Sequence, residues 1–425
     1  MAYSRAAAQR WKLPPIQDLD DPSFDPFLGD EISFGDIVDP HTILHAMAKE
    51  SWVHEIEYRR IFTDTPNAAM EPYGFRYFTV FGYDNIMAML PQGDVFSNKP
   101  LALTIGTSFG RTISGMDAPE HTRYRRIFQK AFLPQTVRKW GDSVVKPVVD
   151  GLLDKIAENG RADLVADFTI HYPFQVIYRQ LELPPDDAST FQKLGLTQTC
   201  FYYAPDKAIE AGEKLGDYFT PMVEARREDP GDDLVSALAL AEVEGERLPV
   251  DVVVSLLRQL TNAAGDTTYR GTGTLLVGLL THPDQLEAVR LDRTLIPAAI
   301  DEALRWDGPV IAATRMTTRD YTHNGFTFPK GVVIDFVQGM GDRDPAKYPN
   351  PDRFDIFRDR SVRHLAFTTG PHVCLGQHLA RVEMERALNG LLDRFPKLRL
   401  DPDMPPPVIR GFNLRTPTAI HVRFD

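Results

Sequence analysis

The loop at residues 367–376 holds the side chains of this chain that are best suited to chemistry. It reads Phe-Thr-Thr-Gly-Pro-His-Val-Cys-Leu-Gly, and its Cys374 opens a long predicted helix. Unpaired backbone N–H groups and the helix dipole favour a thiolate at such a position. Gly370 and Gly376 would let the backbone approach a flat partner, against which Phe367 could lie. A lone thiolate cannot complete a tetrahedral zinc site, but it can be the axial ligand of haem iron.

A second candidate lies in the predicted helix 250–280, where residues 263–268 read Ala-Ala-Gly-Asp-Thr-Thr. Glycine and threonine are weak helix formers, and threonine hydroxyls can bend a helix by bonding back to its carbonyl groups. A bent turn leaves a groove for a small molecule or water, and Asp266 beside Thr267 suggests proton delivery there. The alternatives are an ordinary polar step in a buried helix and, for Cys374, a small buried core residue.

Composition narrows the classes of function. The chain has 425 residues, 43% of them hydrophobic, and a net charge of −12, which makes nucleic acid a poor partner. Its two cysteines, Cys200 and Cys374, do not form a disulfide framework. No apolar run has the length of a membrane span, and the first residues lack a secretory signal, so we expect a cytoplasmic protein.

Hydrophobic periodicity predicts a mainly α fold with a small β-rich region, organised as a single large domain over 1–425. Helices are expected at 119–133, 135–158, 165–182, 187–202, 206–227, 231–241, 250–280, 283–290, 294–306 and 375–393, with helical patterns near 41–62. Strands are expected at 74–82, near 325–337 with a hairpin turn at Asn324-Gly325, and at 419–424. Residues 1–40 and 340–366 are expected to be irregular.

The spacing Phe-x-x-Gly-x-x-x-Cys-x-Gly resembles the haem-binding signature of cytochrome P450 monooxygenases, whose iron ligand is a cysteine thiolate. Residues 263–268 are similar to the family's Ala-Gly-x-Asp/Glu-Thr-Thr/Ser motif above the haem. Two positions depart from the pattern, because Thr368 and Ala264 stand where the family usually has glycine. The resemblance implies a cytochrome P450 fold of the soluble bacterial type.

The same resemblance implies a role for each matching residue. Cys374 would be the axial iron ligand, and Asp266 and Thr267 would be the catalytic acid–alcohol pair. The residues implied to bind haem are His121, Arg125, Arg315 and His372 at the propionates, with Phe367 and Gly376 beside the ring. An ion-pair network of Glu302, Arg305 and Arg353 would support the haem loop.

The implied activity is that of a haem b monooxygenase that uses O₂ to oxidise a small hydrophobic molecule. Electrons would come from NAD(P)H through a ferredoxin reductase and a ferredoxin, or a flavodoxin. The docking patch for this electron donor would be formed by Arg123, Arg126 and Lys130. The alternative is that these residues are only a solvated helix face. We expect a monomer that binds neither nucleic acid nor membrane. Terpenoid, steroid, fatty acid and aromatic substrates all remain open, and a pocket is expected around 96–112, 262–263, 310–313 and Phe412.

Three rival functions share part of this pattern. A peroxide-using haem-thiolate enzyme would need no ferredoxin, although in such relatives the acid–alcohol pair is typically replaced. A catalytically silent haem-thiolate protein would bind CO when reduced and oxidise nothing. A helical protein without haem would show neither property.

Overall fold

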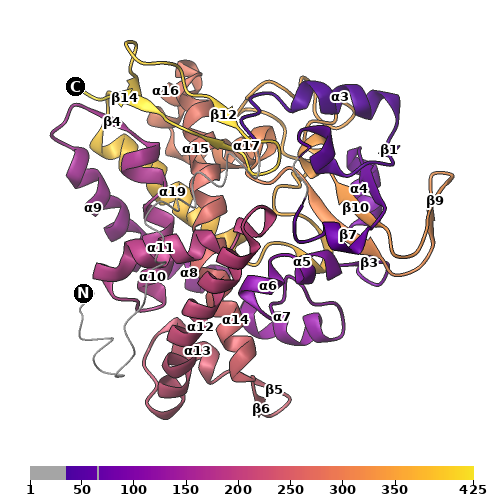
Figure 1. Ribbon diagram of the computed structural model, residues 1–425. Coiled ribbons are helices and arrows are strands. Elements are labelled where there is room, and N and C mark those ends of the chain that lie inside the picture. The colour runs from indigo at the N-terminus through magenta and orange to yellow at the C-terminus, as the bar shows by residue number, and fades with distance from the viewer. Residues whose placement is uncertain (1–34, 65–66) are drawn as a thin grey trace.

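The computed structural model describes residues 35–64 and 67–425, so most of the segment 1–40 that was expected to be irregular lies outside the described residues. The chain is mainly α, as predicted (Figure 1). The α-helices are α3 (His41–Glu50), α4 (Tyr83–Met89), α5 (Lys99–Leu103), α6 (Gly106–Phe109), α7 (Glu120–Ala131), α8 (Pro134–Trp140), α9 (Lys146–Ile156), α10 (Tyr172–Gln180), α11 (Ala188–Thr197), α12 (Pro205–Glu228), α13 (Leu234–Ala239), α14 (Val250–Ala263), α15 (Asp266–Leu280), α16 (Pro283–Leu291), α17 (Ile296–Asp307), α18 (Gln338–Gly341) and α19 (Gln377–Arg394).

The strands are short. They are β1 (Val53–His54), β2 (Tyr77–Val80), β3 (Phe96–Ser97), β4 (Arg161–Asp163), β5 (Glu242–Val243), β6 (Glu246–Arg247), β7 (Ala313–Thr317), β8 (Tyr321–His323), β9 (Phe326–Phe328), β10 (Val333–Phe336), β11 (Arg399–Leu400), β12 (Ile409–Arg410), β13 (Thr416–Pro417) and β14 (His421–Arg423). Two short 3₁₀ segments, η1 (Tyr58–Ile61) and η6 (Cys200–Tyr202), also matter for the cavity described below.

The largest sheet has the strand order β1-β2-β10-β7-β3. Its central strand β10 is parallel to β2 and antiparallel to β7. The expected hairpin is confirmed, because β8 and β9 pair across Asn324 and Gly325, whose φ angles of 46° and 78° suit a tight two-residue turn. In Figure 1 this sheet, α3 and α4 form one side of the molecule, and most long helices form the other.

The predicted helix 250–280 is two helices. Its regular hydrogen bonding fails between α14 and α15, where the N–H of Gly265 donates to the carbonyl of Asn262, only three residues back. Gly265 also packs on α10, since a Cβ there would lie 2.5 Å from the Phe174 ring. Both helices are largely buried, and they run through the middle of the helical side (Figure 1).

Candidate active site

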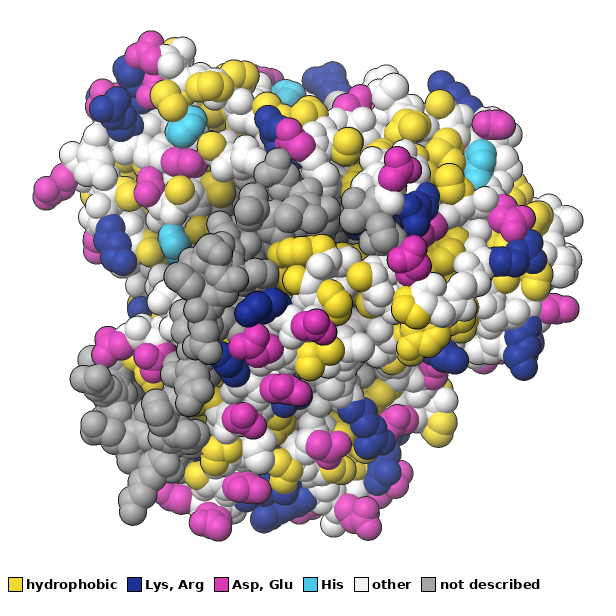
Figure 2. Space-filling model, viewed as in Figure 1, with side chains coloured by type: hydrophobic (Ala, Val, Ile, Leu, Met, Phe, Trp, Pro, Cys, Tyr) yellow, Lys and Arg dark blue, Asp and Glu magenta, His cyan; other side chains and the backbone are white. Residues whose placement is uncertain are grey.

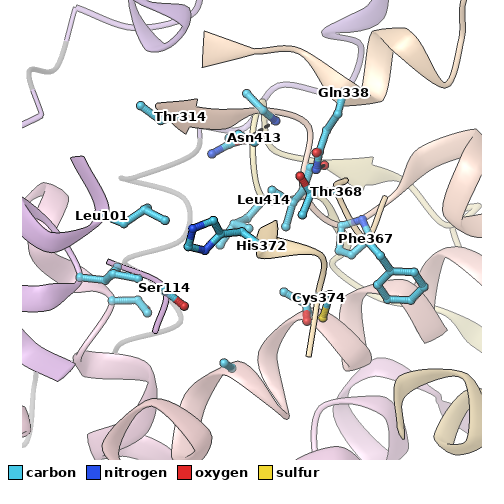
Figure 3. Close-up of a pocket in the computed structure, with 18 of the residues that line it drawn as sticks. Leu101, Ser114, Thr314, Gln338, Phe367, Thr368, His372, Cys374, Asn413 and Leu414 are labelled. Atoms are coloured by element: carbon cyan, nitrogen blue, oxygen red, sulfur yellow. Dashed lines mark hydrogen bonds between the residues drawn. The ribbon is translucent and has the colours of Figure 1, made fainter. Parts of the chain in front are cut away.

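A cavity of about 540 Å³ lies where α15, the loop before α19 and strand β7 meet. Cys374, Thr267 and Arg315 line it from these three elements. Figure 3 shows Cys374 and Phe367 on one side of the cavity, with Leu101 across from them. The fold therefore brings together the two motifs that the sequence places more than a hundred residues apart.

Cys374 stands directly before the final long helix, as the sequence predicts. The helix begins at Gln377, with Gly376 as its cap residue. The backbone N–H of Cys374 donates to the carbonyl of Phe367 at 2.9 Å and so closes the loop. Cys374, Phe367 and Gly376 all line the cavity, and the Arg381 guanidinium lies 4.6 Å from the centre of the Phe367 ring.

The turn within this loop depends on two residues with positive φ, Thr368 at 56° and Gly370 at 79°. A Cβ at Gly370 would lie 2.5 Å from the Cα of Pro91. Gly370 is therefore required by the turn and by the contact with Pro91. We expected it to face the flat partner, but it does not line the cavity. Thr368 adopts a left-handed conformation that is costly for a β-branched residue and easy for the family's usual glycine.

Burial raises the pKa of the Cys374 thiol. The backbone N–H groups of Gly376 and Gln377 oppose this rise, as do the charges of Arg125 and Arg381. The helix-terminal donors expected from the sequence are thus present and lower the pKa of the thiol, although burial outweighs them in the metal-free site. A coordinated metal cation changes this balance, because a thiol that binds a metal loses its proton.

Four basic side chains converge beside the cavity, and they are those expected at the propionates. The rings of His121 and His372 lie 3.9 Å apart between their centres. Burial, followed by the charge of Arg125, lowers the pKa of His121, and burial with the neighbouring basic groups lowers the pKa of His372 to about 3. Arg125 donates to the carbonyl of Val373 at 2.7 Å, and Arg315 is almost fully buried.

This cluster fits the carboxylates of haem. Among the described residues, no hydrogen-bond partner reaches the enclosed Nε2 atom of His121. Buried polar atoms without partners are rare, and guanidinium groups pair well with carboxylates. Haem propionates at this cluster would give His121 a hydrogen-bond partner and would pair with the guanidinium groups of Arg125 and Arg315. Cys374 would then supply the sulfur ligand of the iron.

The acid–alcohol pair does not face one direction. Thr267 and Thr268 line the cavity, whereas Asp266 does not. Asp266 is buried and accepts two hydrogen bonds from Arg270, at 3.0 Å from Nε and 2.9 Å from Nη2. The i,i+4 spacing of these two residues could have revealed this pair in the sequence. Ala264 occupies the cavity wall where the family usually has glycine.

The network around Glu302 corrects one prediction. Arg305 binds Glu302 in bidentate fashion, with distances of 2.7 and 2.8 Å. The second arginine is Arg358, whose Nε lies 3.3 Å from Glu302, and not Arg353. Arg353 has an exposed side chain and contributes its backbone carbonyl, which accepts a hydrogen bond from Arg358 at 2.9 Å. Because the next residue, Phe354, is buried, the Arg353 side chain is directed outward, and Arg358 approaches the carboxylate instead.

The predicted docking patch on α7 is exposed but not uniformly basic. Arg126 and Lys130 are exposed, while Arg123 lies 3.5 Å from Glu244 of the β5–β6 turn. Figure 2 shows Lys and Arg side chains mixed with Asp and Glu over α7 and β5–β6. Within residues 35–64 and 67–425, no helix has the length and apolarity needed to cross a bilayer.

Comparison with known proteins agrees with this geometry. The family model described as Cytochrome P450 matches residues 200–422. The chain is 33% identical over 369 residues to the cytochrome P450 monooxygenase PikC of Streptomyces venezuelae, covering 83% of this chain and 88% of PikC. It is 35% identical over 289 residues to the vitamin D(3) 25-hydroxylase of Pseudonocardia autotrophica, covering 67% of this chain and 70% of that enzyme.

Solved structures show the same fold. The cytochrome P450 PksS of the Bacillus subtilis 168 bacillaene synthase superposes with a TM-score of 0.80 at 27% identity, covering 95% of this chain and all of PksS. CYP109E1 of Bacillus megaterium in complex with testosterone has a TM-score of 0.78 at 25% identity, covering 91% and 99% of the two chains. The cysteine loop, the broken helix and these similarities lead to one conclusion: the chain belongs to the cytochrome P450 family.

Proposed function

We propose that this cytochrome P450 monooxygenase holds the iron of haem b through Cys374 and oxidises a hydrophobic small molecule with electrons from a ferredoxin. One observation carries this assignment: Cys374 and Thr267 line the same cavity from separate elements. A thiolate ligand needs the first position, and a hydroxyl that handles protons near bound oxygen needs the second.

The haem, when bound, supplies the activation of O₂, and the residues of the chain position it and control its surroundings. Cys374 would hold the iron, and its thiolate would donate electron density to the bound haem. Arg125 and Arg315 would compensate the charge of the propionates, and His121 and His372 would donate hydrogen bonds to them. These roles need no movement of the backbone, because all five side chains already border or adjoin the cavity.

Thr267 and Asp266 have separate tasks in this proposal. Thr267 lines the cavity, and its hydroxyl can hold or pass a proton there. Asp266 is held by Arg270, and it acts as a positioning residue that fixes the first turn of α15. A direct passage of protons from Asp266 to the cavity would require this ion pair to open.

The electron donor is inferred from charge. The protein has a net charge of −12, so an acidic ferredoxin can approach only at a locally basic surface. Exposed Arg126 and Lys130 lie on α7, the helix that also carries the haem-side residues His121 and Arg125. Docking there would place the donor near the haem edge, and the same surface could accept a flavodoxin.

A hydrophobic substrate is supported by the apolar walls of the cavity, which include Leu256, Leu260, Ala263 and Ala312. The names of two similar proteins also indicate hydrophobic ligands: one is a vitamin D(3) 25-hydroxylase, and the other is CYP109E1 in complex with testosterone. Small side chains such as Ala263 and Ala312 leave room for a bulky skeleton.

The haem assignment is tested by the dithionite-reduced CO complex. We expect the red-shifted Soret band of thiolate ligation, and we expect Cys374→Ser to lose it. Cys200→Ser is the matched control, since Cys200 lies outside the cavity lining and its replacement should leave the band unchanged. A Cys374→Ser protein that keeps the band would refute the ligand assignment.

Turnover separates the monooxygenase from its rivals. With NAD(P)H, ferredoxin reductase and ferredoxin, product should form and should carry ¹⁸O from ¹⁸O₂. Product formed with peroxide alone, and none with the ferredoxin system, would instead identify a peroxide-using enzyme. Normal CO binding without product from any hydrophobic compound would favour a catalytically silent protein.

A further inference from the structure

The cavity has a polar end that the reaction itself does not use. Glu57, Arg59, Tyr77, Tyr202 and Asp335 line it, and we call these five residues the polar end. Asp335 accepts a hydrogen bond of 2.6 Å from Thr314, which Figure 3 shows on the far side of the cavity from Cys374. The polar end thus lies away from the iron ligand.

The sheet register places two of these residues. Strand β10 pairs Val333 with Tyr77 of β2 and Asp335 with Thr79, so that Tyr77 and Asp335 project from the same face of the sheet. Asp335 also accepts the backbone N–H of Tyr58 at 3.1 Å. Its position is therefore fixed by strand pairing and by two hydrogen bonds.

The other three come from the 3₁₀ segments. Glu57 and Arg59 lie at the start of η1, and Tyr202 ends η6. Arg59 is only 5% exposed, and its guanidinium carbon lies 5.0 Å from the centre of the Tyr202 ring and 5.6 Å from that of the Phe412 ring. The Oε2 atom of Glu57 lies 3.6 Å from the Nε atom of the exposed Arg60. A buried cation between two rings is held in place by cation–π contacts.

The electrostatics of the polar end oppose a charged ligand of either sign. Burial and the charge of Asp335 raise the pKa of Glu57, and burial raises the pKa of Asp335. Burial also raises the pKa of Tyr202 to about 12, so its phenol is neutral. Arg59 and Glu57 act on each other as opposite charges, so a charged head group of either sign would find no spare counter-charge here to replace its water. Hydrogen-bond donors and acceptors, however, are plentiful.

We infer that the polar end binds a neutral group with several hydrogen-bonding atoms, such as an amide, on an otherwise hydrophobic substrate. The substrate would lie with its apolar part toward Cys374 and its polar group between Tyr77, Tyr202 and Asp335. This inference rests on the proposed function, and it names the class of substrate for the same cavity. Sites built to hydrogen-bond a polar group discriminate strongly against ligands that lack it.

Three probes with similar alkyl chains and different head groups test this inference: dodecanamide added from a cosolvent, dodecanoate and dodecyltrimethylammonium. Binding is followed by the low-to-high-spin shift of the ferric haem. We expect dodecanamide to bind at least about tenfold more tightly than either ion. This difference corresponds to one or two hydrogen bonds that the amide makes and the ion does not. Equal or tighter binding of either ion would overturn the inference.

Conservative variants locate the contact. Tyr77→Phe and Tyr202→Phe each remove one hydroxyl and should weaken dodecanamide binding roughly fivefold to tenfold. Tyr73→Phe is the matched control, because Tyr73 is 52% exposed and does not line the cavity. Glu57→Gln keeps a hydrogen-bonding side chain without the charge and should relax the discrimination against dodecanoate.

A control ligand that binds the iron tests whether the variants leave the haem side of the cavity unchanged. 4-Phenylimidazole binds the iron directly, and its affinity should be the same in all four variants. If both phenylalanine variants bind dodecanamide as the parent protein does, the polar end does not bind the substrate. If instead no thiolate-type CO complex forms in the parent protein, the proposed function itself fails, and the two failures are distinguishable.

Discussion

Thr267 lines the cavity wall beside the helix break and carries a hydroxyl. We expect Thr267→Ala to keep haem and substrate binding while product per O₂ consumed falls, by an amount on the order of tenfold or more. The lost electrons should appear as hydrogen peroxide, which a peroxidase assay measures. Thr267→Ser retains the hydroxyl and should restore coupling, whereas equal coupling in Thr267→Ala and the parent would remove Thr267 from the oxygen step.

Asp266 and Arg270 form a buried ion pair, with side chains 7% and 1% exposed. Removing one member of a buried ion pair is costly, so Asp266→Ala should lower the free energy of unfolding by about 3–5 kcal/mol. The double variant Asp266→Ala/Arg270→Met removes both charges and should be less destabilised than Asp266→Ala alone. Urea unfolding followed by circular dichroism measures both values. A cost below about 1 kcal/mol for Asp266→Ala would mean that the pair has no structural role.

Arg358 joins the irregular segment before the cysteine loop to helix α17 through Glu302. The side chains of Arg358 and Glu302 are 10% and 4% exposed, and Glu302 stays paired with Arg305 in the variant, so Arg358→Ala should cost about 1.5–3 kcal/mol and speed the loss of haem. Arg353→Ala is the matched control, and because that side chain is exposed it should change stability by no more than about 0.5 kcal/mol. Haem transfer to apomyoglobin measures retention. The reverse order of effects would support the original assignment of Arg353.

At the level of elements, the sequence predicted most long helices because their apolar residues recur with a helical period. It did not predict that α14 and α15 are separate, although Gly265 and the threonines gave a signal. The missing information was a partner distant in sequence, since Gly265 is required by its contact with Phe174 of α10. The same holds for Gly370, whose contact is Pro91. Close packing between remote segments has no local signature.

For the molecule as a whole, the candidate site was predictable where chemistry is local to a motif. Cys374, Thr267, Arg125 and His372 could be chosen from spacing and resemblance, and the structure places all four on one cavity. The polar end was not predictable, because Tyr77 and Asp335 meet only through the pairing of β2 with β10. Strand register joins residues that no periodicity connects.

The stability of the whole protein should depend on pH through Glu383 of α19. This side chain is fully buried, and its two carboxyl oxygens have no hydrogen-bond partner among the described residues. Burial raises its pKa well above the usual 4.5, so the folded protein keeps the proton. The Tyr172 phenol interacts electrostatically with Glu383. It remains neutral because burial raises the pKa of Tyr172 as well.

Below the unfolded pKa of Glu383, both the folded and the unfolded protein carry the proton, and its contribution to stability is complete. As the pH rises above that value, only the unfolded chain releases the proton, so the free energy of unfolding should fall by about 1.4 kcal/mol per pH unit until the folded pKa is reached. Glu383→Gln has a similar shape and no proton to lose, and it should abolish this decrease. Urea unfolding of the haem-loaded parent and variant across the weakly acidic to neutral range measures the two slopes. Parallel slopes would show that Glu383 is ionised in the folded protein, which its enclosed position forbids unless a cation or water reaches it.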